Sequence, residues 1–186
     1  MNRGMLARLK YLAPLALLVS ASAWGLELHY APRENLARID CGLIDDSVDS
    51  VDMEAYVLSD QSVIASLIAA ADRGVVIRLY LDKGQFSQHD PARGGRIEEL
   101  LGYPNVFARV KGKGVLMHLK AYVVDRRVLR TGSGNFSRPG LADQDNDLVV
   151  FDDAEAIANF EANFDAIFAR GTNVEAMGTK VAGWRR

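Results

Sequence analysis

Short apolar runs alternate with amphipathic segments along most of the chain, and the two patterns predict different elements. Runs rich in Val, Ile, Leu and Tyr, bounded by polar or glycine-containing turns, predict buried strands. Segments with apolar residues three and four positions apart predict helices. The expected strands lie near residues 26–30, 50–57, 75–81, 105–110, 115–125, 128–131 and 147–151, and the expected helices near 33–44, 60–73, 91–102 and 153–169.

This order of elements predicts an α/β fold in one domain, with a mixed β-sheet flanked by helices on both faces. Gly74 follows an expected helix and is suited to end it, and Asp152 or Asp153 is suited to cap the start of the last helix. The chain has 186 residues, 49% of them hydrophobic, which is enough for one sizeable core. Residues 171–186 lack periodicity, so we expect a loosely held C-terminal tail.

The N-terminal segment differs in kind from the rest of the chain. Basic residues precede an apolar stretch at 11–23, and no acidic residue occurs before Glu27. The run Ala21-Ser22-Ala23 offers a small-residue cleavage site, so residues 1–25 are predicted to be a secretory signal peptide. An uncleaved membrane anchor is the alternative, although the apolar stretch is shorter than the roughly 20 residues of a spanning helix. Cleavage would leave no stable membrane span and would place the protein in a bacterial periplasm or outside the cell.

The candidate chemistry is concentrated in one stretch with the pattern His-x-Lys-x4-Asp-x6-Gly-Ser-x-Asn. Its defined positions are His118, Lys120, Asp125, Gly132, Ser133 and Asn135. An imidazole can act as nucleophile or proton carrier, an amine supplies positive charge, and hydroxyl and carboxamide groups donate hydrogen bonds to phosphoryl oxygens. A lone His-x-Lys pair is more often a surface feature, but the joint spacing favours a site that breaks phosphodiesters.

The local geometry also follows from the pattern. Residues 120–125 have the composition of a buried strand, and side chains two apart share a face, so His118 and Lys120 should point the same way. A polar turn and a returning strand would bring Ser133 and Asn135 back beside His118. Asp125 falls at the strand end and faces the other side, so we interpret it as a structural residue of the hairpin.

The stretch resembles the HKD motif of the phospholipase D superfamily. The chain from about Leu28 to Phe168 is also similar to that domain in the order of its elements. The resemblance, which is to small single-motif bacterial nucleases and phospholipase D-like proteins, implies a phospholipase D-like sandwich as the catalytic domain over residues 26–170.

The resemblance implies a role for each motif residue. His118 would attack phosphorus and form a phosphohistidine. Lys120, Ser133 and Asn135 would bind the non-bridging phosphate oxygens. The family signature counts Asp125 with His118 and Lys120 as catalytic, whereas the strand argument gives it a structural role.

One position departs from the family pattern. Relatives of this size usually carry a glutamate shortly after the motif asparagine, where it orients the nucleophilic histidine. Here that position is Asn146, flanked by Asp145 and Asp147. Asn146 could hold the orientation of His118 without stabilising an imidazolium, and either aspartate could substitute with a small shift in register. The departure bears on the level of activity more than on the type of reaction.

A second histidine is needed, because in-line displacement requires a nucleophile on one side of phosphorus and a proton donor on the other. The chain has three histidines. His29 is interpreted as a strand-end residue, and His89 falls in an expected loop where it could touch substrate. With no second motif or internal repeat, the simplest arrangement is a twofold homodimer that juxtaposes two copies of His118. The resemblance implies the same arrangement.

No metal or other cofactor is expected. The single cysteine, Cys41, excludes a zinc knuckle and an internal disulfide, and its amphipathic helix predicts that it is buried. An acidic group could invite a divalent ion but is more simply a loop and a helix cap. Its members are Asp143, Asp145, Asp147, Asp152 and Asp153.

The formal net charge of −2 argues against tight nonspecific nucleic-acid binding by bulk charge, and loss of the basic N-terminal segment makes the chain more acidic. Basic residues nevertheless flank the motif and form either a rim for a phosphodiester or a solvated loop. They are Arg109, Lys111, Lys113, Arg126, Arg127 and Arg130.

Three functions remain open. The first is an exported, metal-independent, nonspecific endonuclease that acts through a phosphohistidine. The second is a phospholipase D that releases phospholipid head groups by the same chemistry. The third is a catalytically weak phosphate-binding protein, which the intact motif disfavours and Asn146 mildly favours.

Overall fold

A computed structural model describes residues 25–84, 96–112 and 114–176 of the chain. The predicted signal peptide, His89, Lys113 and residues 177–186 of the expected tail lie outside these ranges, apart from Gly25. Within them, no helix combines the length and the apolar character required to cross a membrane.

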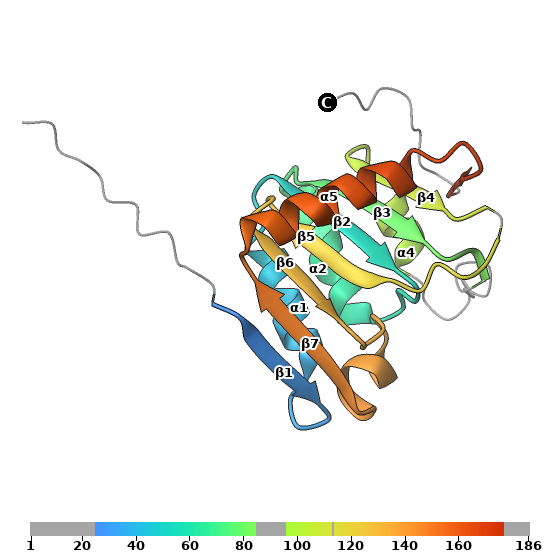
Figure 1. The fold of residues 1–186 in the computed structure, drawn as a ribbon. Helices are drawn as coiled ribbons and strands as arrows, with labels where there is room; N and C mark the ends of the chain where they lie inside the picture. Colours follow the sequence, from blue (N-terminus) through green and yellow to red (C-terminus); the bar gives the residue numbers. More distant parts are fainter. Residues whose placement is uncertain (1–24, 85–95, 113, 177–186) are drawn as a thin grey trace, which may run out of the picture.

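The described residues form one mixed, eight-stranded sheet with helices on both faces (Figure 1), which confirms the predicted fold class. The strand order is β1-β7-β6-β5-β2-β3-β4-β8. Strands β2, β3 and β4 are parallel, and the other neighbouring pairs are antiparallel. The bounds are β1 Glu27–Ala31, β2 Ser50–Ala55, β3 Val76–Leu81, β4 Val106–Val110, β5 Lys120–Val124, β6 Val128–Gly132, β7 Asn146–Phe151 and β8 Val174–Glu175.

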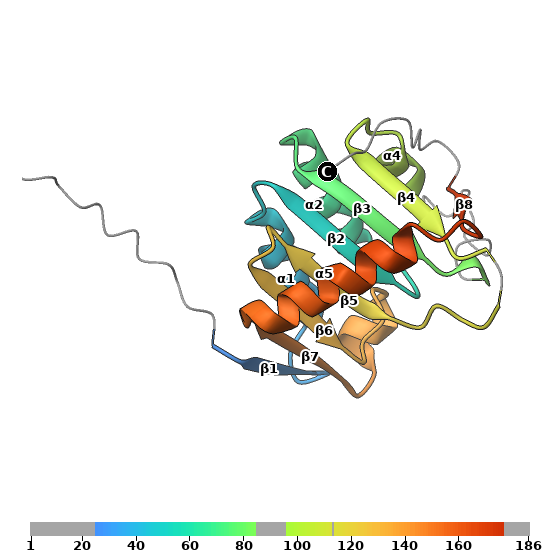
Figure 2. The ribbon, with the colours of Figure 1, turned by 45° about the horizontal axis from the view of Figure 1, so that its top comes forward.

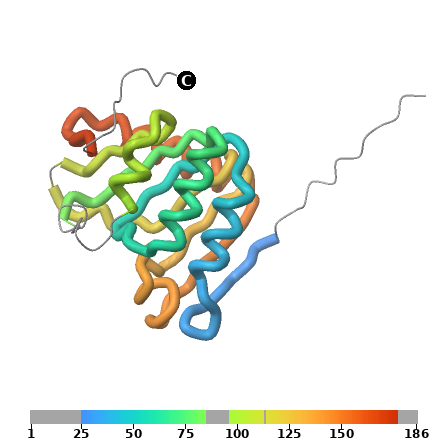
Figure 3. Tube along the Cα trace, turned by 180° about the vertical axis from the view of Figure 1, so that it is seen from behind, coloured from blue at the N-terminus to red at the C-terminus, as the bar shows by residue number. Residues whose placement is uncertain are grey.

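The helices divide unequally between the two faces of the sheet. Three of them, α1 Leu36–Asp45, α2 Gln61–Asp72 and α4 Ile97–Leu101, cover one face, as Figure 3 shows from behind. The long helix α5, Ala154–Phe168, crosses the other face and is the one helix of the described residues that does so (Figure 2). A π-helical turn, η2, spans Pro139–Asp143 between β6 and β7.

The larger hydrophobic core lies between the sheet and the three helices, and a smaller aromatic cluster lies under α5. In the polar part of the α5 interface, Arg78 of β3 is buried and pairs with Asp52 of β2 and, at 2.8 Å, with Asp165 of α5. The charge of Arg78 is therefore neutralised in place, as a buried charge requires.

The predicted helix ends are confirmed. Gly74 follows the end of α2 with a φ of +91°, the left-handed conformation that favours glycine after a helix. Asp153 is the N-cap of α5, and its carboxylate accepts a hydrogen bond from the Ala156 amide at 2.7 Å.

Two boundaries differ from the sequence expectation. The strand expected over 115–125 begins only at Lys120, and the preceding residues have no regular structure. The described part of the expected tail is packed rather than loose, because Val174 pairs with Val110 of β4 and Ala176 is buried. A two-residue strand is too short to leave a periodic signal in the sequence.

The topology gathers the segments that carry the motif at one end of the sheet. Lys120 at the start of β5 pairs with Ala55 at the end of β2. Gly132 at the end of β6 pairs with Leu148 near the start of β7. Because β5 and β6 form a hairpin, the residues just before β5 and just after β6 lie at the same edge.

Candidate active site

His118 and Lys120 lie at the entrance to β5 in contrasting environments. The His118 side chain is exposed, whereas Lys120 is buried, with 8% of its surface accessible. The Lys120 ammonium donates a hydrogen bond to the His118 carbonyl oxygen at 2.7 Å. Burial lowers the pKa of Lys120, since its described partner is a neutral carbonyl rather than a carboxylate. A cation held in this way keeps its capacity to attract a phosphate.

An aromatic residue that the sequence reasoning missed lies against both groups. The ring of Tyr56, which follows β2, is 4.6 Å from the His118 imidazole between centroids and is tilted by 59°. The Lys120 Nζ lies 5.0 Å from the same ring centroid. In the sequence Tyr56 reads as one more strand-forming residue. Its place just past a buried strand was the signal that could have singled it out.

Ser133 is held by the two residues that were predicted to orient His118. Its hydroxyl donates to the Asn146 Oδ1 at 3.1 Å and accepts from the Asp147 amide at 3.0 Å. Hydrogen bonds from Ser133 lower the pKa of Asp147, one of them from the Ser133 amide at 3.0 Å. Asn146 and Asp147 therefore both hold Ser133, and within the described structure no hydrogen bond joins either of them to His118.

Close packing brings this loop against β7. A Cβ atom on Gly132, whose φ is +154°, would lie 2.3 Å from the Asp147 carbonyl oxygen, so only glycine fits here. Further along, the Asn135 carboxamide oxygen is buried and has no hydrogen-bond partner in the described part of the chain. Buried polar atoms are normally satisfied. This oxygen is an acceptor, so a hydrogen bond from Asn135 to a phosphoryl oxygen would have to come from its amide nitrogen.

A fully buried ion pair holds the backbone of Lys120. Arg130 of β6 donates to Asp40 of α1 through Nε at 2.7 Å and through Nη2 at 3.1 Å. Its Nη1 donates to the Lys120 carbonyl oxygen at 3.1 Å. Tyr122 donates its hydroxyl to Asp40 at 2.9 Å, and burial raises the pKa of Tyr122 so that the phenol stays protonated. The backbone of Lys120 is thus anchored through three elements.

Of the two interpretations of the basic residues that flank the motif, a rim around the site does not fit most of them. Arg130 is inaccessible to solvent, and Arg126 and Arg127 lie in the turn at the other end of β5. The guanidinium of Arg109 packs over the Phe168 ring, 5.6 Å from its centroid. Lys111 does lie at the site's end of the sheet, where its ammonium donates to the Leu116 carbonyl oxygen at 3.2 Å.

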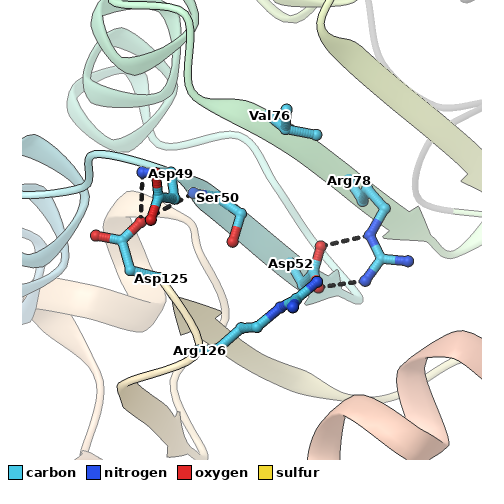
Figure 4. Close-up of a pocket in the computed structure, with 7 residues that line it drawn as sticks. All are labelled: Asp49, Ser50, Asp52, Val76, Arg78, Asp125 and Arg126. Atoms are coloured by element: carbon cyan, nitrogen blue, oxygen red, sulfur yellow. Dashed lines mark hydrogen bonds and ion pairs between the residues drawn. The ribbon is translucent and has the colours of Figure 1, made fainter. Parts of the chain in front are cut away.

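Asp125 is separated from the other motif residues by the length of β5. Its carboxylate accepts hydrogen bonds from three successive amides, those of Val48, Asp49 and Ser50, at 3.0, 2.7 and 2.9 Å. Figure 4 shows it beside a cavity of about 370 Å³ whose other walls come from the start of β2 and β3. This position agrees with the structural interpretation and separates Asp125 from His118 and Lys120, with which the family signature groups it.

His29 does not supply a second imidazole. It lies on the outermost strand β1, where its ring nitrogens contact Glu34 at 2.8 Å and Glu27 at 3.3 Å. The Glu34 contact raises the pKa of His29. Strands β7 and β6 intervene between β1 and β5, which separates His29 from His118 by roughly 14 Å at the usual strand spacing.

Other candidate ligands are dispersed. Among the residues with described positions, no three or more His, Cys, Asp or Glu side chains are grouped to hold a metal ion. Cys41 is only partly buried, packed against the core, where the sequence predicted full burial.

Comparison with known proteins identifies relatives in sequence. Residues 41–168 match the family described as "Cardiolipin synthase, PLD-like domain". Proteins named phospholipase D from Rickettsia bellii and Rickettsia felis are 27% and 26% identical over 135 residues, 73% of this chain. The chain spans 65% of the length of each of these relatives.

Solved structures share the fold. Nuc from Salmonella typhimurium, a phospholipase D family member, superimposes with a TM-score of 0.70 over 82% of this chain and 97% of its own, at 19% identity. NucT from Helicobacter pylori gives a TM-score of 0.72 over 81% and 98%, also at 19% identity. The family match, with His118 and Lys120 at one sheet end beside Ser133, leads to one conclusion: this chain belongs to the phospholipase D superfamily.

Proposed function

We propose that the protein is an exported phosphodiesterase that cleaves nucleic acids without metal through a covalent intermediate on His118. The observation that carries this proposal is an exposed imidazole beside a buried ammonium whose described partners are a carbonyl oxygen and an aromatic ring. This arrangement pairs a nucleophile with an unneutralised cation, as attack on an anionic ester requires.

The covalent step follows from these positions. An imidazole nitrogen of His118 forms a bond to phosphorus while the bond from phosphorus to the leaving oxygen breaks, and a general acid gives that oxygen a proton. Water then attacks phosphorus, loses its proton to the same group, and releases His118. The Lys120 ammonium and the Ser133–Asn135 loop would hold the non-bridging oxygens in both steps.

The general acid is proposed to be the partner subunit's His118 in a twofold homodimer. The described part of the chain offers no second imidazole near the first, since His29 is held between two glutamates on the outermost strand. A twofold axis beside the exposed His118 would place two imidazoles on opposite sides of one phosphorus.

Nucleic acid is the proposed substrate because the motif resembles that of small single-motif bacterial nucleases. Nuc and NucT, which share the fold over nearly their whole length, are compatible with it. Export remains our expectation from residues 1–25, which resemble a signal peptide.

Phospholipid is the second candidate substrate, and a specific feature favours it. Three apolar side chains next to His118 are exposed: Val115 by 83%, Leu116 by 59% and Leu119 by 43%. Apolar groups beside a phosphodiester site would suit a lipid surface. The Rickettsia relatives are also named phospholipase D.

Turnover by the full chain in EDTA tests the proposal. The substrates would be single-stranded DNA, double-stranded DNA, RNA and phosphatidylcholine vesicles, with His118→Ala as the inactive variant and His29→Ala as the control. Nucleic-acid cleavage that is lost only in His118→Ala would support the nuclease. Head-group release alone would replace it with the phospholipase, and silence on every substrate would favour the phosphate-binding alternative.

A further inference from the structure

Tyr56 contacts both His118 and Lys120, and its place in the fold alone does not require these contacts. Its side chain is partly exposed, and it belongs to none of the hydrophobic clusters of the described residues. The ring instead lies against the His118 imidazole and under the Lys120 ammonium.

The backbone around Tyr56 is held beside the residues of the motif. The Tyr56 amide donates to the Leu119 carbonyl oxygen at 2.9 Å, which extends the pairing of β2 and β5 beyond their last ladder residues. Leu119 stands between His118 and Lys120 in the sequence, so the Tyr56 backbone runs alongside the stretch that carries both. Shortly afterwards, Leu58 bridges to Phe136, the neighbour of Asn135. One short segment therefore lies against both the stretch that carries His118 and Lys120 and the neighbour of Asn135.

Two physical effects act through the ring. An aromatic face attracts a cation within about 6 Å, which stabilises the Lys120 ammonium that burial disfavours. The tilted contact between two rings favours one orientation of the imidazole over free rotation, which reduces the entropy lost on reaching the attack geometry. A positive charge that forms on His118 during the reaction would also lie beside the ring.

We propose that Tyr56 is a positioning residue of this site, whose ring orients His118 for attack and keeps the Lys120 ammonium beside it. The kinetic consequence rests on the proposed function, whereas the orientation of the imidazole does not. The ring rather than the hydroxyl carries the role, so phenylalanine should replace tyrosine and leucine should not.

The orientation is tested without any turnover. Proton NMR of the full chain would follow the His118 ring resonances, assigned by their loss in His118→Ala. The neighbouring aromatic ring should displace them from ordinary positions in the wild type and in Tyr56→Phe, and Tyr56→Leu should remove the displacement. Tyr30→Leu, which removes an exposed tyrosine from the edge strand β1, is the matched control. Unchanged His118 resonances in Tyr56→Leu would overturn the proposal.

Kinetics and phosphate binding test the consequence. Tyr56→Leu should lower kcat by about 10-fold or more with KM changed less than about threefold, and Tyr56→Phe should stay near wild type. An equal loss in both variants, or no loss in either, would overturn the positioning role. If the wild type has no turnover, the proposed function fails and inorganic phosphate becomes the probe. Weaker phosphate binding in Tyr56→Leu alone would then support the role, and equal binding in all variants would overturn it.

Discussion

At the scale of single residues, burial decides which groups of the motif are charged and available. Lys120 is buried with a carbonyl partner, and burial lowers its pKa. Arg130, on the neighbouring strand β6, is fully buried but paired with Asp40. In the sequence both are simply basic residues. Only the tertiary contact with Asp40 of α1 neutralises Arg130 and gives it a structural role. The sequence could therefore predict which residues form the motif, but it could not predict that Arg130 is unavailable to a substrate.

Lys120→Met should separate function from stability. The ammonium is expected to attract the phosphoryl group, so kcat/KM should fall by about 100-fold or more. Stability should be unchanged or higher, because methionine fills a similar volume without a buried charge. Thermal unfolding and steady-state kinetics of the same preparation measure both. Lys111→Met, at a more exposed amine near the site, is the control and should retain most activity.

Glu54 predicts a pH dependence of stability. Burial under α5 raises the pKa of Glu54 to about 7, and its described partner is the Asn163 amide at 3.2 Å. The folded state therefore holds a proton that the unfolded state releases near pH 4.5. The protonated Glu54 carboxyl therefore makes its full contribution to the stability of the fold below about pH 4.5, and this contribution is lost as pH rises through about 7.

Glu54→Gln should remove this dependence and raise the free energy of unfolding at pH 8 by up to about 3 kcal/mol. Urea unfolding of both proteins between pH 4 and 8 would measure the difference. The prediction fails if the two curves run parallel over this range. Glu98→Gln, at an exposed carboxylate of α4, is the control and should leave the pH dependence unchanged.

At the scale of elements, the β5–β6 hairpin is what places the motif. Three residues join the two strands, and the first two, Asp125 and Arg126, have φ angles of 50° and 54°, a left-handed pair suited to the twist of a tight hairpin. The sequence predicted this hairpin, because a polar turn between two apolar runs is a local signal. It could not predict β8, which is two residues long and depends on β4 for its partners.

Asp125→Ala should destabilise the fold by about 2 kcal/mol, since three amides lose their acceptor and alanine tolerates the left-handed conformation poorly. The folded fraction should keep its kcat within about twofold, because the carboxylate lies at the far end of β5 from His118. Urea unfolding and kcat measured well below the melting temperature test the two parts. A large loss of kcat in fully folded protein would instead give Asp125 a role in catalysis. The control is Asp49→Ala in the same loop, whose exposed side chain can be removed while its amide remains.

At the scale of the whole molecule, the chain has one motif, so a single subunit supplies only one of the two imidazoles that the proposed reaction needs. The fold class and the sheet end that carries the site were both predictable, because they follow from alternating patterns and from strand direction. The surface around the site was not predictable in the same way. The exposed residues next to His118 in the sequence include Val115, Leu116 and Leu119, whereas most of the basic residues that could have formed a rim lie elsewhere. Exposure depends on which residues the rest of the fold covers.

The proposed homodimer makes a quantitative prediction for mixed subunits. If each site needs two copies of His118, equal amounts of wild-type and His118→Ala subunits, allowed to exchange, should retain about a quarter of the activity of an all-wild-type sample at the same total concentration. Sedimentation equilibrium would establish the dimer first. Retention of about half the activity would show that each subunit works independently.

The most direct test of the central claim is a search for the covalent intermediate on His118. The full chain would react with bis(p-nitrophenyl) phosphate in EDTA, be quenched in alkaline denaturant, and be digested for mass spectrometry. The account predicts a p-nitrophenyl phosphoryl adduct on His118 that is absent in His118→Ala. Turnover without any adduct on His118 would contradict the account. So would turnover that is absent in EDTA and appears when Mg²⁺ is supplied.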